Sequence, residues 1–150
     1  MRYNAEQIRN LLHCLEHQKA AELESDTLEF KEWSAEWEGG EAGKRKFYRM
    51  LAEYAVCFAN HQGGTLVLGV KDQVQGYARA LTGCGVYDPN EIRTRIYEMT
   101  DPKLLVEVEE LRIDDLGVRL LLVHCPRGIG VHTTTDGVAK VRVGAECKPM

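Results

Sequence analysis

The sequence predicts an α+β domain in which a mixed, largely antiparallel sheet of about five to six strands is flanked by about three helices. Two segments repeat apolar residues at helical spacing, and a third begins with a proline-containing helix cap. Apolar runs of strand length lie between these segments, and three more fill the last third of the chain. This order favours α+β over a strictly alternating parallel fold. A length of 150 residues fits a single domain over residues 1–150.

The first expected elements are a helix and a short strand. Apolar residues recur at helical spacing after Asn4, a residue type that caps helices, which predicts an amphipathic helix over about residues 5–20. Apolar and charged residues then alternate over residues 28–31, as in a half-buried strand. The alternation places Glu29 and Lys31 on the same face of that strand.

The centre of the chain contains the clearest helical signal. Residues 34–43 are acidic and glycine-containing without a periodic pattern, so we expect a loop there. A strong apolar repeat over residues 44–59 predicts a core helix, and a pair of glycines ends it. The mostly apolar residues that follow predict a central strand, with Asp72 at its end.

The last part of the chain is expected to be one helix and three strands. Asp88 and Pro89, with a glutamate three residues after the aspartate, form the signature of a capped helix start. Hydrophobic runs over residues 104–113, 118–126 and 138–144 predict three strands. The short turn between the first two predicts an antiparallel hairpin.

Composition and charge exclude several classes of protein. No apolar run approaches the roughly 18 residues of a membrane span, and the polar amino terminus lacks the apolar core of a signal peptide. The lack of a signal peptide predicts a cytoplasmic location. The five cysteines are scattered and contain no C-x-x-C pair, which predicts reduced thiols. The net charge is −4, with −6 in residues 1–43 and +2 in residues 44–150. A nucleic-acid partner therefore requires a local basic patch, or a metal ion that bridges carboxylates to phosphate.

Three carboxylates form a candidate metal site. Glu24 and Glu29 lie around the start of the first expected strand, and Asp72 lies at the end of the second. If these strands are neighbours, the three side chains converge, and their oxygens suit Mg²⁺ or Mn²⁺. Lys31, on the face of Glu29, would then be placed to hold phosphate. A simpler interpretation remains open, in which the strand carries an exposed charge pattern and Asp72 starts a turn.

Other motifs indicate no cofactor site. The stretch GGEAGKR has the wrong glycine spacing for a phosphate-binding P-loop, and Arg45 stands where serine or threonine is needed, so no ATP site is expected. His13 and His17 lie four residues apart on the first expected helix, and a solvated or packed helix face explains them more simply than a zinc site.

Four blocks of sequence, taken in order, carry a family resemblance: ESDTLEFK, CFANHQGGTLVLGVKD, LLLVHCPRG and VRVG. Together they resemble the Schlafen AlbA-like domain family, of AlbA_2 type and labelled DNA-binding, over about residues 20–146. The resemblance implies a mixed α/β domain that binds nucleic acid. For the Schlafen branch it implies a metal-dependent endoribonuclease that acts on structured RNA such as transfer RNA.

The same resemblance implies roles for single residues. The family's catalytic glutamates fall on Glu24 and Glu29 and its aspartate falls on Asp72, so these three would bind Mg²⁺ or Mn²⁺ and carry catalysis. The family's lysine falls on Lys31. The arginine near the end of the domain falls on Arg142, where a guanidinium would hold the scissile phosphate.

A set of basic and polar residues is expected to contact nucleic acid. The start of the central helix is basic although positive charge there opposes the helix dipole, which indicates either phosphate contact or ordinary solvation. The polar loop over residues 127–135 offers further hydrogen-bond donors. The expected nucleic-acid-binding residues are Lys31, Lys44, Arg45, Lys46, Arg49, Arg127, His132, Lys140 and Arg142.

Two functions remain open beside RNA cleavage. One is a non-catalytic DNA- or RNA-binding module of a regulator, and the other is a dimerisation or adaptor domain, which the negative charge and the Trp33 and Trp37 segment suggest. Schlafen nucleases combine two such lobes, so the resemblance implies a homodimer or a C-terminal partner domain that completes a groove. We expect the chain to be the amino-terminal module of a longer protein, with no membrane partner.

Overall fold

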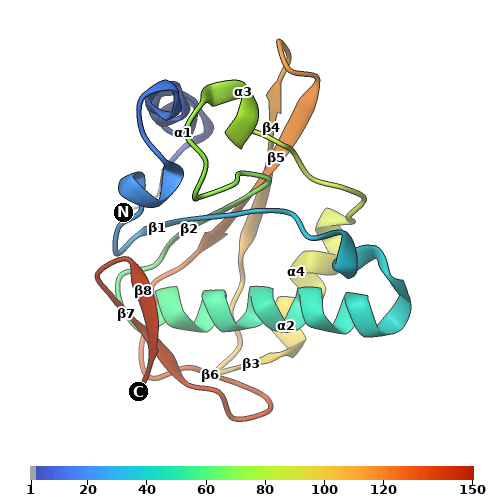
Figure 1. Ribbon diagram of the computed structural model, residues 1–150. Helices are drawn as coiled ribbons and strands as arrows, with labels where there is room; N and C mark the ends of the chain where they lie inside the picture. The colour runs from blue at the N-terminus through green and yellow to red at the C-terminus, as the bar shows by residue number, and fades with distance from the viewer. Residues whose placement is uncertain (1–2) are drawn as a thin grey trace.

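A computed structural model describes residues 3–150 and confirms the α+β class (Figure 1). The strands are β1 (Leu28–Lys31), β2 (Gly64–Leu68), β3 (Thr100–Asp101), β4 (Glu107–Ile113), β5 (Val118–Cys125), β6 (Thr133–Thr134), β7 (Lys140–Val143) and β8 (Glu146–Pro149). The central sheet has the order β1-β2-β5-β4, in which β1 and β2 are parallel and the other neighbours antiparallel. It has four strands rather than five to six, because β3 pairs with β6 and β7 with β8 in separate two-stranded ribbons.

Helices cover both faces of the sheet. The α-helices are α1 (Ala5–Leu12), α2 (Gly40–Ala59), α3 (Tyr77–Ala80) and α4 (Pro89–Glu98), and short 3-10 turns occupy His13–Glu16, Ala20–Leu23 and Ala35–Glu38. In Figure 1, α1 and α3 lie on one side of the sheet, and α2 and α4 on the other. The expected Asn4 and Asp88 caps are both present, but the first α-helix ends at Leu12 and continues as 3-10 turns rather than to residue 20.

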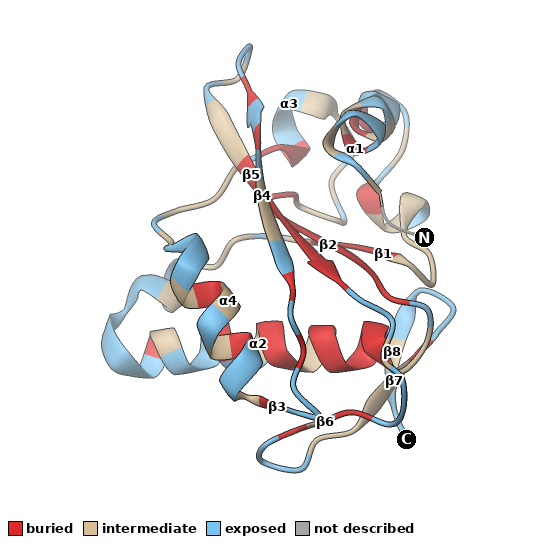
Figure 2. Cartoon of the chain, turned by 180° about the vertical axis from the view of Figure 1, so that it is seen from behind, coloured by how far each residue is buried: buried red, intermediate tan, exposed pale blue. Residues whose placement is uncertain are grey.

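Two apolar clusters, one on each face of the sheet, hold the layers together. Successive residues of a strand point to opposite faces, so Leu28 and Phe30 of β1 join the cluster under α1. Glu29 and Lys31 point to the other face, where α2 lies. Figure 2 shows buried residues concentrated along the sheet and in the half of α2 that ends at Ala59. The fold therefore brings the polar side chains of β1 beneath α2.

The expected loop over residues 34–43 is largely helical instead. Ser34 accepts a hydrogen bond from the Glu36 amide at 3.2 Å and starts a 3-10 turn, and α2 already begins at Gly40. A Cβ at Gly43 would lie 2.0 Å from the Glu36 carbonyl oxygen, so only glycine allows this close approach. Contacts between aromatic rings hold the segment, which explains why its sequence shows no helical period.

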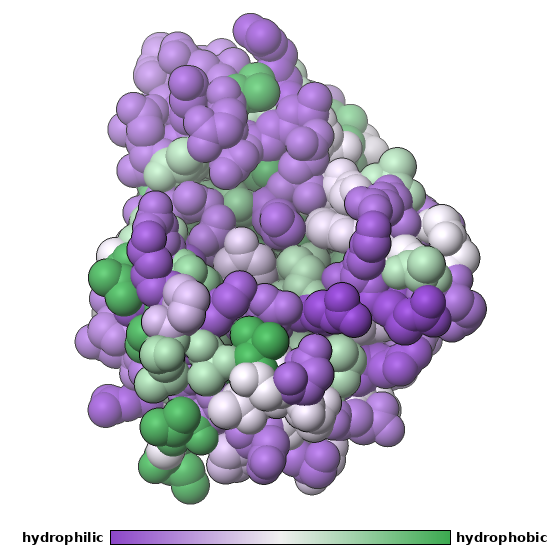
Figure 3. Space-filling model, turned by 60° about the horizontal axis from the view of Figure 1, so that its bottom comes forward, coloured by the Kyte–Doolittle hydropathy of each residue, from purple (hydrophilic) through white to green (hydrophobic). Residues whose placement is uncertain are grey.

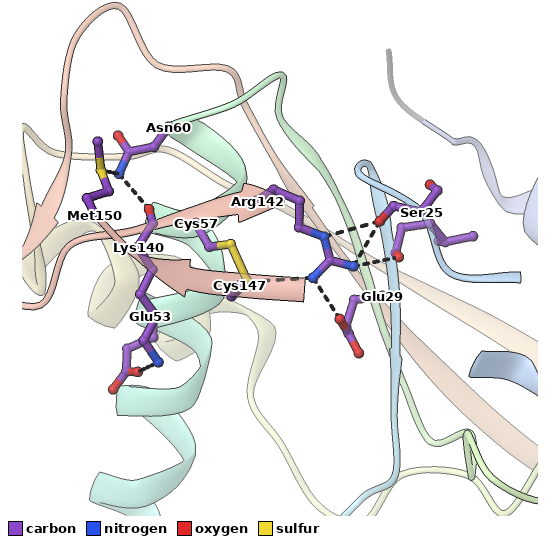
Figure 4. The surroundings of a disulfide bond; sticks show 10 residues. Ser25, Glu29, Glu53, Cys57, Asn60, Lys140, Arg142, Cys147 and Met150 are labelled. Atoms are coloured by element: carbon purple, nitrogen blue, oxygen red, sulfur yellow. Dashed lines mark hydrogen bonds and ion pairs between the residues drawn. A yellow bond between two sulfur atoms is a disulfide. The ribbon is translucent and has the colours of Figure 1, made fainter. Parts of the chain in front are cut away.

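A disulfide bond joins Cys57 of α2 to Cys147 of β8 (Figure 4). The expectation of reduced thiols is therefore wrong for this pair, whose Cα atoms are 5.9 Å apart. The two cysteines are 90 residues apart in sequence, and only the packing of the β7–β8 ribbon against α2 brings them together. Burial raises the pKa of Cys84 and of Cys125 to about 12, so these two remain protonated thiols.

The outer surface is mainly polar. Hydrophilic side chains cover most of the face that Figure 3 turns forward, and hydrophobic side chains gather there in a few patches. Exposed large hydrophobic residues include Leu105, Ile129 and Val131. Within residues 3–150, no helix combines the length and the apolar character that a membrane span requires.

Candidate functional site

Two carboxyl groups lie together at the start of β1. Glu24 precedes the strand, and its Oε2 accepts a hydrogen bond from the Phe30 backbone amide at 2.9 Å. A tight turn between Ser25 and Leu28 brings Glu24 back beside the strand, where its side chain shares a hydrogen bond with Glu29. Two carboxyl groups can share a hydrogen bond only when one of them carries a proton.

The environment of Glu24 favours its protonated form. Burial and, next, the hydrogen bond with Glu29 raise the pKa of Glu24 to about 8, and the charge of Asp72 acts in the same direction. The Phe30 amide opposes this shift because it donates to the carboxylate. Glu24 therefore holds its proton at neutral pH.

Arg142 of β7 is buried and fixes the position of Glu29 (Figure 4). Its Nη1 donates to Glu29 Oε1 at 2.8 Å and lies 3.6 Å from Cys147 Sγ. Its Nε and Nη2 donate to the Ser25 carbonyl at 3.1 and 2.9 Å, and Nη2 also donates to the Leu28 carbonyl at 3.0 Å. A guanidinium has five N–H donors, and all are directed at the protein. This geometry does not agree with the expected phosphate contact and makes Arg142 a positioning residue for Glu29.

Tyr54 of α2 lies where the charged side chains converge. Burial raises the pKa of Tyr54 to about 12, and the charges of Glu29, Glu24 and Asp72 add to the shift. The Lys31 ammonium lies 5.9 Å from the centre of the Tyr54 ring. The structure therefore brings the three expected carboxylates and the expected lysine into one neighbourhood.

Two cavities, each of about 660 Å³, meet at this neighbourhood, and Glu29 and Tyr54 line both. The first lies between α2 and the β7–β8 ribbon, and we call it the basic groove. Its basic side chains are Lys46, Arg49, Lys140 and Lys148. The second lies beside the end of β1, and we call it the aromatic pocket. Its other lining residues are Phe30, Lys31, Glu32, Trp33, Ser34, Ala35, Trp37 and Asp72.

The residues of both cavities lie within a stretch of sequence that matches a known family. A family model described as Schlafen, AlbA_2 matches residues 24–150, a range that begins at Glu24 and includes both cavities. The chain belongs to the Schlafen AlbA_2 family. This membership relates the domain to nucleic acids.

The fold of this AlbA_2 domain also occurs in a solved structure. The DIP2311 protein from Corynebacterium diphtheriae superposes with a TM-score of 0.68 at 22% sequence identity, a level that shows the fold alone. The alignment covers 97% of this chain and 29% of that chain, so the present chain spans less than a third of that protein. A search of curated proteins found no match.

Three of the expected nucleic-acid-binding residues line the basic groove of the AlbA_2 domain. Lys140 forms an ion pair with Glu53 at 2.8 Å, and Lys46 forms one with Glu36. Arg49 is exposed on α2. Such partly exposed ion pairs contribute little to stability, so these lysines can exchange a carboxylate for a phosphate at low cost.

The other expected residues lie apart from this groove. Lys44 pairs with a glutamate of α4 at 3.1 Å, Arg45 is exposed near the start of α2, and Arg127 is exposed beyond the end of β5. His132 is buried, and its Nδ1 donates to the Pro102 carbonyl at 2.7 Å. The expected contact between His132 and nucleic acid therefore does not agree with the structure. The buried ring instead links the residue after β3 to the segment before β6.

The carboxyl pair is the part of the site that fits a divalent cation. Across residues 3–150, no three or more His, Cys, Asp or Glu side chains are grouped closely enough to hold a metal ion, so Asp72 does not complete the expected three-carboxylate site with Glu24 and Glu29. However, Mg²⁺ is commonly held by one or two carboxylates, with water and substrate phosphate in its other positions. Glu24 and Glu29 fit this mode, because a cation can replace the proton that they share.

Some residues of the site have no recognisable signal in the sequence. Tyr54 continues the apolar repeat of α2, so its position indicates a core residue. Lys148 follows the last family motif and joins the groove only because β8 folds back on β7. The sequence singles out Trp33 and Trp37 but assigns them no contact with the carboxylates.

Proposed function

We propose that this AlbA_2 domain binds nucleic acid in the basic groove and, with Mg²⁺ or Mn²⁺, cleaves structured RNA such as transfer RNA. The observation that carries the proposal is the Glu24–Glu29 pair. Glu29 lines a groove with four basic side chains, and Glu24 beside it keeps a proton that a cation can displace.

Nucleic-acid binding is supported by the distribution of charge in the groove. The chain has a net charge of −4, so a polyanion is not attracted to the protein as a whole. Lys46, Arg49, Lys140 and Lys148 nevertheless outnumber the three carboxylates that line the same cavity. Three of them must exchange an ion pair with a glutamate before they can replace a counterion on a phosphate. A second copy of the chain or a further domain would complete this groove around a folded RNA.

Cleavage is supported by the chemistry of the carboxyl pair. In this proposal Glu24 and Glu29 would hold the cation, which would supply an activated water for hydrolysis of the phosphodiester. Glu24 must release its proton for this, so the cation and the proton compete for the same carboxyl group. Arg142 keeps the Glu29 carboxylate oriented, and Lys31 stabilises the charge that develops on the phosphate.

A second candidate is a binding module without catalysis. It is favoured by the 2.8 Å ion pair between Arg142 and Glu29, which already balances the charge of Glu29 without a metal. In this alternative the same groove holds DNA or RNA, and the carboxylates fix the turn before β1.

The two candidates are separated by incubating the protein with labelled transfer RNA, single-stranded DNA and duplex DNA in Mn²⁺, Mg²⁺ or EDTA. The cleavage proposal predicts metal-dependent RNA products that disappear with EDTA and with Glu24→Gln. Glu98→Gln, which changes an exposed glutamate on α4, is the matched control and should retain activity. Salt-dependent binding without any product would favour the binding module, and the absence of both would refute the proposal.

A further inference from the structure

The two cavities that meet at Glu29 and Tyr54 have different chemistry. Four basic and three acidic side chains line the basic groove, so its lining is net positive and suits phosphate, whereas one basic and three acidic side chains line the aromatic pocket. Trp33 and Trp37 instead line the aromatic pocket. Among the residues that the structure describes, Lys31 is the one basic residue that lines this pocket. A nucleic-acid strand has the same division, with charged phosphates on one side and flat neutral bases on the other.

The tryptophan rings form a fixed platform. Trp37 packs against Trp33 with ring centres 5.2 Å apart and an interplanar angle of 84°, and against Phe47 of α2 at 5.1 Å. The Trp33 indole donates to Glu38 at 3.1 Å, which fixes its orientation. Both tryptophans are only partly buried although they pack on the core. A surface that is already rigid loses little entropy when a flat ligand stacks on it.

The polar groups of the pocket suit a base rather than a second phosphate. Glu32, Ser34 and Asp72 line it and offer oxygen acceptors. Carboxylates repel phosphate but accept hydrogen bonds from the amino groups of bases. The volume of about 660 Å³ gives room for a base together with its sugar.

We infer that the aromatic pocket takes an unpaired nucleobase from the strand whose phosphates lie in the basic groove. This inference rests on the proposed function and narrows its substrate to single strands, loops or bulges. A paired base is excluded because its edge and both of its faces are occupied within the duplex. Glu29, at the junction of the cavities, would then lie beside the phosphate next to the captured base.

Fluorescence gives a direct test, because both tryptophans of the chain line this pocket. The protein is titrated in EDTA with an RNA strand of about 12 nucleotides, and separately with an abasic strand of equal length and charge. Binding is followed by anisotropy of a label on the strand and by tryptophan emission. We expect the abasic strand to bind about ten-fold or more weakly and to leave tryptophan emission unchanged, since stacking is lost.

Variants test the platform separately. Trp37→Ala should reduce the difference between the two strands, Trp37→Phe should restore part of it, and Tyr97→Ala, which alters an exposed ring on α4, should leave it unchanged. Circular dichroism confirms folding, and the comparison of strands on the native protein decides the question if Trp37→Ala does not fold. Equal affinity and equal quenching by the two strands would overturn the inference and leave the proposed function intact. No salt-dependent binding of either strand would overturn both.

Discussion

Replacing Arg142 by methionine removes a buried cation whose five N–H groups all donate to atoms of the protein. The change leaves the Glu29 carboxylate buried without its partner at 2.8 Å and leaves the Ser25 and Leu28 carbonyls without their donors. Breaking a buried, hydrogen-bonded ion pair by removing one partner costs about 3–5 kcal/mol. That loss is a large part of the 5–15 kcal/mol that typically stabilises a domain, so the variant should fold but only marginally.

Urea unfolding followed by circular dichroism measures this loss. The matched control is Arg112→Met, which breaks a 3.3 Å ion pair with Glu110 on an exposed arginine and should cost less than about 1 kcal/mol. Adding Glu29→Gln to Arg142→Met should recover part of the stability, because the uncompensated charge is removed. An Arg142→Met loss no greater than that of the control would show that the guanidinium does not position Glu29.

Three further outcomes follow from the structure. Cys147→Ser should lower the free energy of unfolding by about 4–5 kcal/mol in urea, since the disulfide closes a loop of 90 residues, whereas Cys14→Ser at an exposed free cysteine should change little. Glu24 binds its proton more tightly in the folded protein than in the unfolded chain, so the free energy of unfolding should fall as the pH rises from 4.5 to about 8. A series of unfolding curves at different pH values measures this fall, and Glu24→Gln should abolish it. In binding measured against salt concentration, Lys46→Ala and Arg49→Ala should each weaken transfer RNA binding and reduce the salt slope by about one, and unchanged slopes would exclude phosphate contact at these positions.

Local patterns in the sequence were sufficient for much of the fold. The apolar repeat predicts α2, and the caps at Asn4 and Asp88 predict the starts of α1 and α4, because each signal involves neighbouring residues. The sequence also predicts that Glu24 and Glu29 lie near Asp72 if the first two strands are neighbours, and β1 and β2 do pair. Their role as metal ligands stays a prediction.

The features that sequence did not reveal depend on contacts between distant segments. An arginine late in the chain is expected at the surface, and only the packing of the β7–β8 ribbon on α2 makes Arg142 a buried partner of Glu29. The same packing brings Cys57 and Cys147 together. The start of α2 was missed because a glycine contact and the tilted packing of Trp37 on Phe47, rather than an apolar period, determine it.

Single-turnover cleavage of transfer RNA shows whether Glu24 acts in catalysis rather than in RNA binding, when binding and products are measured in the same Mn²⁺ reactions. Native protein and Glu24→Gln are compared side by side at pH 8. We expect both proteins to bind the RNA with similar affinity in the basic groove and only the native protein to cleave it. Equal cleavage by the two proteins, or RNA binding by neither, would contradict the assignment of this site.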